Sequence, residues 1–153
     1  MLIRRATPSD SSAIAYVFQR AFRPFEHLYT PDSFASTAVG EEVILQRMEA
    51  GFSWIALEGT EALGTVSATP TWDGFYVTGM AVLPEAQGKK IAYQLMKTLE
   101  DCGREEGYKR IYLYTTTFLD NAIRLYEKFG FTRYGNPADH WMGTTVIQFE
   151  KYL

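Results

Sequence analysis

A segment rich in glycine and lysine stands between a predicted strand and a predicted helix. The β-rich run Phe75–Leu83 leads into Glu85-Ala86-Gln87-Gly88-Lys89-Lys90-Ile91-Ala92. A helix start offers unpaired amide donors and a partial positive charge, which together attract phosphate or another anion. Gly88 lets the backbone approach a ligand closely. Lys89 and Lys90 add positive charge in a chain of net charge −3. These residues predict an anion site without naming the anion.

The spacing alone also fits an ordinary strand–helix connection with solvated lysines. The segment lacks the G-x-G-x-x-G pattern of dinucleotide binders and the G-x-x-x-x-G-K-[ST] pattern of P-loops.

A second residue that could take part in chemistry is Tyr126, whose hydroxyl is a donor with a reference pKa of about 10. When Tyr126 is considered alone, its place on an apolar helix face favours the interpretation that it packs in the core.

The elements that must position these residues follow from hydrophobic periodicity and turn signals. The predicted strands are Leu2–Ala6, Ser53–Leu57, Leu63–Thr69, Phe75–Leu83, Arg110–Thr116 and Thr144–Tyr152. The predicted helices begin at Thr7-Pro8-Ser9-Asp10 (ending before Pro24), cover Gly40–Ala50 and 91–106, and run from Asp120 to Phe129. The aromatic stretch Arg23–Ser36 is expected to be irregular.

The resulting order is β-α-α-β-β-β-α-β-α-β. Short turns between the second, third and fourth strands favour an antiparallel meander. The strand 75–83, helix 91–106 and strand 110–116 form a βαβ unit, which should be right-handed and parallel. We therefore expect a mixed α/β fold with a central mixed sheet of six to seven strands and helices on both faces.

Composition narrows the class of protein. A chain of 153 residues with 46% hydrophobic and 22% charged residues predicts one globular domain with its own core. The net charge of −3 disfavours a nucleic-acid-binding surface, and Cys102 alone cannot form an internal disulfide. No stretch approaches the roughly 20 apolar residues of a membrane span. The N-terminus does not resemble a signal peptide. We expect a cytoplasmic protein with no membrane or nucleic-acid partner and no metal.

Two segments resemble the hallmarks of the GCN5-related N-acetyltransferase (GNAT) superfamily. Gly79–Ala92 looks like motif A, in which a strand ends in apolar-Ala-Val-x-Pro and is followed by [Gln/Arg]-x-x-Gly-x-[Gly/Ala]. Asn121–Phe131 looks like the second hallmark, Ala-x-x-Leu-Tyr-x-x-x-Gly-Phe. The predicted element order is also similar to the GNAT fold. The resemblance covers essentially the whole chain, which we interpret as one GNAT domain over residues 1–153.

The resemblance implies acetyl-CoA as co-substrate and assigns residues to it. Backbone groups of Met80, Ala81 and Val82 would hold the pantetheine arm where two parallel strands splay. The pyrophosphate would be wrapped by Gln87, Gly88, Lys89, Lys90, Ile91, Ala92 and Tyr93. Asn121 is a further candidate, although the family's common asparagine corresponds to Leu119 here. Lys90 replaces the family's usual glycine, and we expect it to keep a negative φ, with its side chain outward or on a phosphate.

The implied reaction is direct attack of a primary amine on acetyl-CoA within a ternary complex. A backbone N–H near Val82 could polarise the carbonyl, and Tyr126 could protonate the leaving thiolate as general acid. In some relatives a carboxylate on the strand before motif A is the general base, but Phe75–Gly79 carries no acid. Candidates by residue type are Glu26, His27, Glu41, Asp73 and His140, or water alone.

The acceptor site would be built from the remaining aromatic segments. These are Phe22–Phe34, the turn Trp72–Tyr76, Phe118 and the loop Asn136–Met142, all of which could instead be satellite core. No cluster of carboxylates or of arginines selects an acceptor, so a small molecule and a peptide both stay open. Edge strands near the C-terminus could pair between two copies as a homodimer.

The leading hypothesis is thus an N-acyltransferase. A catalytically silent acetyl-CoA- or CoA-binding regulatory module is the alternative, because Lys90, Leu119 and the absent base depart from the expected pattern. A generic nucleotide binder on a mixed sheet is a third reading.

Overall fold

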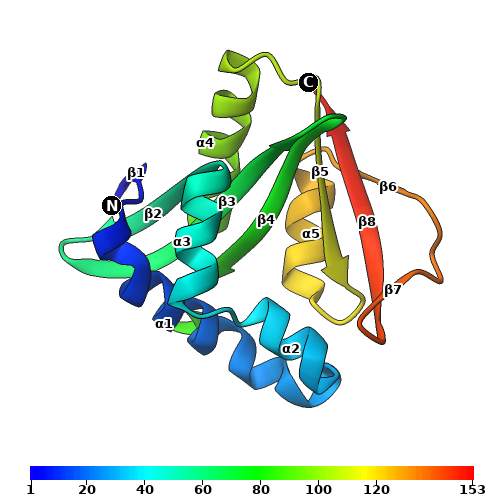
Figure 1. Ribbon diagram of the computed structural model, residues 1–153, viewed down its shortest axis with the longest axis horizontal. Coiled ribbons are helices and arrows are strands. Elements are labelled where there is room, and N and C mark those ends of the chain that lie inside the picture. Colours follow the sequence, from blue (N-terminus) through cyan, green and yellow to red (C-terminus); the bar gives the residue numbers. More distant parts are fainter.

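A mixed sheet of eight strands forms the centre of the computed structural model, which describes all residues from Met1 to Leu153 (Figure 1). The strand order is β1-β2-β3-β4-β5-β8-β6, and β7 pairs with β8 outside this path. All neighbours are antiparallel except β4 and β5. The strands are β1 (Leu2–Arg5), β2 (Phe52–Glu58), β3 (Glu61–Thr71), β4 (Gly74–Val82), β5 (Arg110–Thr116), β6 (Thr132–Tyr134), β7 (His140–Trp141) and β8 (Thr144–Tyr152).

Helices cover both faces of this sheet, as the sequence predicts (Figure 1). The helices α1 (Ser11–Phe22) and α3 (Glu41–Ala50) pack on one face, called the front here. The helices α4 (Ile91–Glu105) and α5 (Asp120–Lys128) pack on the back. Shorter elements are α2 (Pro31–Thr37) and the 3-10 helices η1 (Pro8–Asp10), η2 (Arg23–Leu28) and η3 (Pro84–Ala86).

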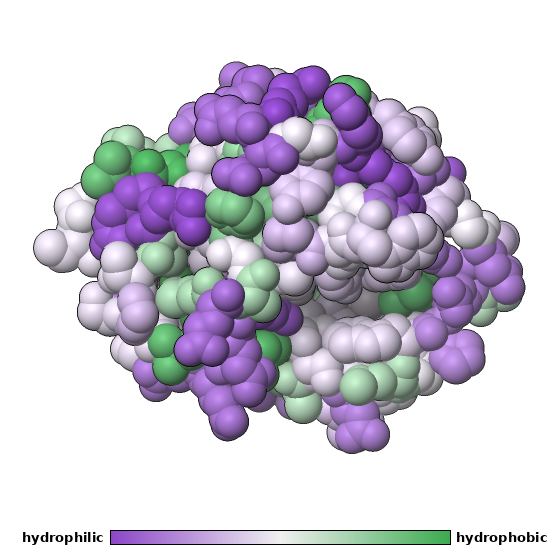
Figure 2. All heavy atoms as spheres, turned by 45° about the horizontal axis from the view of Figure 1, so that its top comes forward, coloured by the Kyte–Doolittle hydropathy of each residue, from purple (hydrophilic) through white to green (hydrophobic).

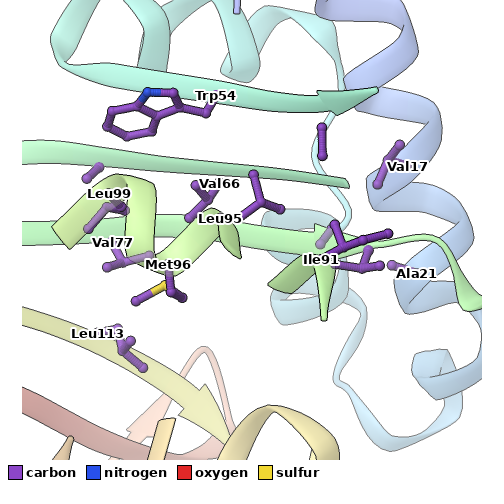
Figure 3. Close-up of a cluster of buried hydrophobic side chains, with 14 of the residues drawn as sticks. Val17, Ala21, Trp54, Val66, Val77, Ile91, Leu95, Met96, Leu99 and Leu113 are labelled. Carbon is purple, nitrogen blue, oxygen red and sulfur yellow. The ribbon is translucent and has the colours of Figure 1, made fainter. Parts of the chain in front are cut away.

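The back of the sheet holds much of the core. Ile91, Leu95, Met96 and Leu99 recur at helical spacing along α4, and each is at most 2% exposed. Figure 3 shows these side chains directed at the strands, against residues such as Val66. Burying a side chain of this size stabilises the fold by about 1.5–3 kcal/mol. This packing fixes the start of α4 against the end of β4.

The parallel strands β4 and β5 pair only at their beginnings. The register contains Phe75 opposite Ile111 and Tyr76 opposite Tyr112, and no later pair. Within β4, a bulge leaves Thr78 without a partner in β3, because Gly79 lies opposite Ser67 and Val77 opposite Ala68. A bulge bends its strand and increases the local twist. The two strands therefore diverge, and the β5-facing edge of β4 stays unpaired towards Val82.

Two sequence expectations need correction. The stretch Arg23–Ser36 is not irregular, since η2 and most of α2 lie in it. Thr30 caps α2, because its Oγ1 accepts from the Ser33 amide at 3.2 Å, and Pro31 occupies the first helical position. The sheet is also larger than the six to seven strands expected, because β6 and β7 are too short for periodicity to reveal.

Candidate active site

A cavity of about 1400 Å³ opens where β4 and β5 diverge. Its wall includes Phe18, Arg47 and Tyr76 on the front of the sheet. Leu113 and Tyr126 line it on the back. The space therefore passes through the sheet, and Figure 2 shows the surface hollowed to the right of centre, with mostly pale residues of intermediate hydropathy at the rim.

One end of the cavity is a row of free backbone donors. The amides of residues 88–93 donate to no acceptor in the protein, and the first helical bond of this region runs from Gln94 to Lys90. Gly88 has a φ of 86°, and a Cβ there would meet no atom within 4 Å, so its surroundings are open. Unpaired donors at a helix start are a ready anion site. The geometry agrees with the anion site that the sequence predicts.

Lys90 departs from the sequence expectation. Its φ is +62° and its ψ is 20°, which is the left-handed conformation, so the expectation of a negative φ is wrong. This conformation costs a residue with a Cβ roughly 1–2 kcal/mol. Glycine adopts it freely, which is a physical reason for the glycine that motif A usually carries at this position. The chain keeps the backbone shape of the motif despite the lysine.

The residues that the sequence assigns to a cofactor lie together around this cavity. Met80, Ala81 and Val82 line it from the unpaired edge of β4. The loop and the start of α4 contribute Gln87, Gly88, Lys90, Ile91, Ala92 and Tyr93. Asn121 also lines the cavity, and its Oδ1 accepts a hydrogen bond from Arg124. Lys89 is exposed and lies outside the lining.

Tyr126 lies on the back wall, on α5. Its side chain is 6% exposed and its ring packs against Phe131 and Phe149, each at a centroid distance of 5.8 Å. Burial, and secondarily the neighbouring Tyr29, raises the pKa of Tyr126 well above its ordinary value. The hydroxyl therefore stays protonated at neutral pH and can donate a hydrogen bond. The ring is both core and cavity wall.

Residues 14–131 match the sequence model of the acetyltransferase (GNAT) family. The chain belongs to this family of enzymes. The match includes β4, the start of α4 and α5, which are the elements that build the cavity.

Relatives agree with this assignment. The chain is 32% identical over 151 residues to an uncharacterized N-acetyltransferase, YjgM, of Escherichia coli strain K12, covering 94% of this chain and 87% of the relative. It is also 32% identical over 110 residues to probable N-acetyltransferase family 8 member 5 of Mus musculus, covering 65% of this chain and 48% of that protein. The GNAT chain thus spans about half the length of the mouse relative.

Solved structures confirm the GNAT fold. The PaiA N-acetyltransferase of Thermoplasma acidophilum, in complex with coenzyme A, superposes with a TM-score of 0.85 at 17% identity, covering 99% of this chain and 98% of that one. The ribosomal-protein-S18-alanine N-acetyltransferase of Escherichia coli gives a TM-score of 0.79 at 17% identity, covering 99% and 92%. At such identities the likeness concerns the fold.

The front end of the GNAT cavity is aromatic. Phe118 packs between Tyr29, at a centroid distance of 4.9 Å, and Phe25, at 6.3 Å. These side chains form a small satellite core and also line the cavity. The aromatic segments therefore serve as core and as cavity wall at the same time. Trp141 of β7 completes this side, whereas Trp72 is 96% exposed and lies outside the lining. Tyr76 is the lining residue of the turn Trp72–Tyr76.

Among the five general-base candidates, His140 alone lines the cavity. Glu26 pairs with Arg23 at 2.9 Å, and Glu41 accepts from Ser11 at 3.1 Å. His27 and Asp73 also lie outside the lining.

Sequence reasoning singled out neither Arg47 nor Thr116 as a residue of the cavity. Arg47 and Thr116 each have a buried polar atom without a hydrogen-bond partner, and both line the cavity. Asp139 lines it next to His140, and its carboxylate accepts from Gln148 at 3.1 Å. Thr116 ends β5 where parallel strands commonly present ligand-binding groups, which is the one signal that the sequence offered.

None of the helices has both the length and the apolar composition of a membrane-spanning segment.

Proposed function

We propose that this GNAT chain transfers the acetyl group of acetyl-CoA to a primary amine of a small molecule or peptide, by direct attack in a ternary complex. One observation carries the proposal: the unpaired edge of β4 leads directly to the free amides of residues 88–93 within one cavity. An extended thioester cofactor with a pyrophosphate needs this pairing of a strand edge with an anion site.

The cofactor would lie across the sheet. Its pyrophosphate accepts from the amides of residues 88–93, with the charges of Lys89 and Lys90 close by in the chain. Its pantetheine arm pairs with the edge Met80–Val82 as an additional strand. The acetyl end then reaches the gap between β4 and β5, with Tyr126 behind it and the aromatic front of the cavity before it.

The chemistry needs one new bond and one broken bond. The neutral amine attacks the acetyl carbonyl carbon, and a backbone N–H near Val82 donates to the developing oxyanion. The C–S bond then breaks, the amide forms, and the amine loses one proton while the CoA sulfur gains one. Tyr126 donates from its hydroxyl to the sulfur as the negative charge develops there. Because burial raises the pKa of Tyr126, this role begins as a hydrogen bond and becomes proton transfer only as the thiolate leaves. Tyr126 then regains a proton from cavity water.

The proton that the attacking amine loses needs an acceptor in the cavity. The strand β4 carries no acid, and His140 is the side chain among the base candidates that reaches the cavity. His140 or cavity water therefore takes this proton.

Binding and turnover test the proposal together. Thermal unfolding is measured with acetyl-CoA, ATP or NAD, and release of the CoA thiol is followed with a broad panel of amines. A ligand at about 100 times its dissociation constant stabilises the fold by about 2.7 kcal/mol. We expect stabilisation by acetyl-CoA and amine-dependent thiol release. Acetyl-CoA binding without turnover of any amine would instead favour the silent CoA-binding module, and stabilisation by ATP or NAD alone would contradict both.

A further inference from the structure

Arg47 projects from α3 into the front of the cavity without a partner. Its Nη1 lies 2.6 Å from where a Cβ on Gly79 would stand, so the absence of a side chain at Gly79 makes room for the guanidinium. The guanidinium carbon is 5.8 Å from the Phe18 ring centroid. Nη1 is buried and has no hydrogen-bond partner. No salt bridge in the protein involves Arg47, although this residue lines the cavity.

This situation differs from that of the other arginines. Six of the nine arginines pair with a carboxylate: Arg4, Arg20, Arg23, Arg104, Arg110 and Arg133. Arg5 and Arg124 have no such partner but are exposed to water. Arg47 alone combines a buried guanidinium nitrogen with the absence of any anion.

An unpaired cation in this position is costly. Burial lowers the pKa of Arg47, and the one titratable group that acts on it is the Tyr76 hydroxyl. Arginine does not give up its proton in proteins, so it cannot escape the cost by neutralising. A partly buried charge that is retained without a partner in the protein is explained if a ligand supplies the partner.

The position of Arg47 relates it to the reacting atoms. Gly79, which it touches, directly precedes the strand edge Met80–Val82 proposed for the pantetheine arm. Arg47 lies on the front of the sheet, whereas Tyr126 lies on the back. An anion held by Arg47 therefore stands beside the acetyl group, on the side from which the acceptor enters. The walls around it, including Phe18 and Phe22, are apolar and aromatic.

We propose that the acceptor is an α-amino acid, whose carboxylate pairs with Arg47 while its amine faces the acetyl carbonyl. This inference rests on the proposed acetyl transfer and names its substrate class. A single guanidinium matches the charge and shape of one carboxylate, and no cation, which a site for a phosphate dianion would favour, is among the groups that shift the pKa of Arg47. The close approach of Arg47 to the strand that holds the acetyl group fits an anion two bonds from the amine. The aromatic front then receives an apolar side chain.

Matched acceptors test this assignment. The kcat/KM of acetyl transfer is measured for the standard L-amino acids, for their carboxamides and for the corresponding decarboxylated amines. The best amino acid should exceed its carboxamide by about 10- to 100-fold, as expected for a charge-assisted hydrogen bond. Arg47→Gln should remove this preference mainly through KM, and Arg47→Lys should keep part of it. Arg133→Gln, an exposed arginine outside the cavity, should leave it unchanged.

Folding and cofactor binding are read in the same samples. Arg47→Gln replaces an unpaired buried cation with a neutral group, so its melting temperature should equal or exceed that of the wild type. Acetyl-CoA should stabilise both proteins equally. Equally efficient acetylation of the amines that lack a carboxylate, failure of every amino acid, or a carboxylate preference that survives in Arg47→Gln would overturn the amino-acid assignment and leave acetyl transfer standing. Absence of acetyl-CoA binding would overturn both.

Discussion

At the scale of single residues, the proposed transfer step depends on the hydroxyl of Tyr126. Tyr126 is held by rings on two sides, and its raised pKa keeps it a donor. Tyr126→Phe should therefore lower kcat by about 100-fold, the lower end of general acid catalysis, because the thiolate leaves unassisted. The dissociation constant for acetyl-CoA should change little, since the ring remains. Steady-state kinetics and calorimetric titration measure the two effects, and an unchanged kcat would remove Tyr126 from the mechanism.

A second prediction at this scale concerns Lys90. Its left-handed backbone strains any residue with a Cβ by roughly 1–2 kcal/mol. Lys90→Gly should therefore be more stable than Lys90→Ala by about 1 kcal/mol, since the unfolded glycine is more flexible and offsets part of the gain. Both variants lose the same charge, so their affinities for acetyl-CoA should fall together. Urea unfolding of the two proteins measures the difference, and equal stability would show that position 90 is not strained.

At the scale of elements, a buried charge cluster joins α4 to β8. Glu100 is 4% exposed and accepts from Lys151 at 3.0 Å and from Arg104 at 2.6 Å. Lys151 also donates to the Phe129 carbonyl at 2.9 Å, at the end of α5. The cluster thus links α4, β8 and the end of α5.

Breaking this cluster on one side should be costly. Lys151→Met leaves Glu100 with Arg104 as its remaining charged partner, and we expect a loss of about 2–4 kcal/mol in the free energy of unfolding. The double variant Glu100→Gln with Lys151→Met should lose less, because no buried charge remains. Denaturant unfolding of the single and double variants provides the measurement. A loss below about 0.5 kcal/mol in the single variant would mean that water already solvates the carboxylate.

The start of α1 should be sensitive to acid. A hydrogen bond from Arg4 lowers the pKa of Asp10 to about 2, and the Thr7 amide also donates to this carboxylate at 2.8 Å. The unfolded value is about 3.9. A lowered folded pKa adds stability that is complete above the unfolded pKa and is lost as the pH falls from about 4 to about 2. The stability gap between wild type and Asp10→Asn should shrink over that window, whereas a constant gap would contradict the pairing.

The sequence predicts the helices and strands well where the hydrophobic periodicity and the Gly and Pro turn residues indicate the same boundaries. Helix α4 and the strands around it follow from regular apolar spacing, and most of the residues that motif A assigns to the cofactor line the cavity. The short strands β6 and β7 were not predicted because they depend on pairing with β8. The helix α2 does carry local signals, the cap Thr30 and Pro31, and was missed although they were present. Arg47 could not be found because its isolation depends on Gly79, which another element brings beneath it.

At the scale of the whole molecule, the divergence of β4 from β5 creates the cavity. The bulge in β4 and the brief pairing with β5 open a passage between the two faces of the sheet. The proposed cofactor end of that passage lies at the start of α4, and the proposed acceptor end lies under α1, α2 and α3. Binding of the cofactor should therefore affect the two ends of the passage differently.

The most direct measurement is the change in backbone amide resonances when acetyl-CoA is added to the isotope-labelled chain, with ATP as the control ligand. The account predicts that the largest changes fall on the amides of residues 88–93 and on the β4 edge at Met80–Val82, while β1 and β2 are unaffected. It also predicts that ATP at the same concentration moves the β4 edge far less. Changes confined to other parts of the chain, or equal changes with ATP, would contradict acetyl-CoA binding at this cleft.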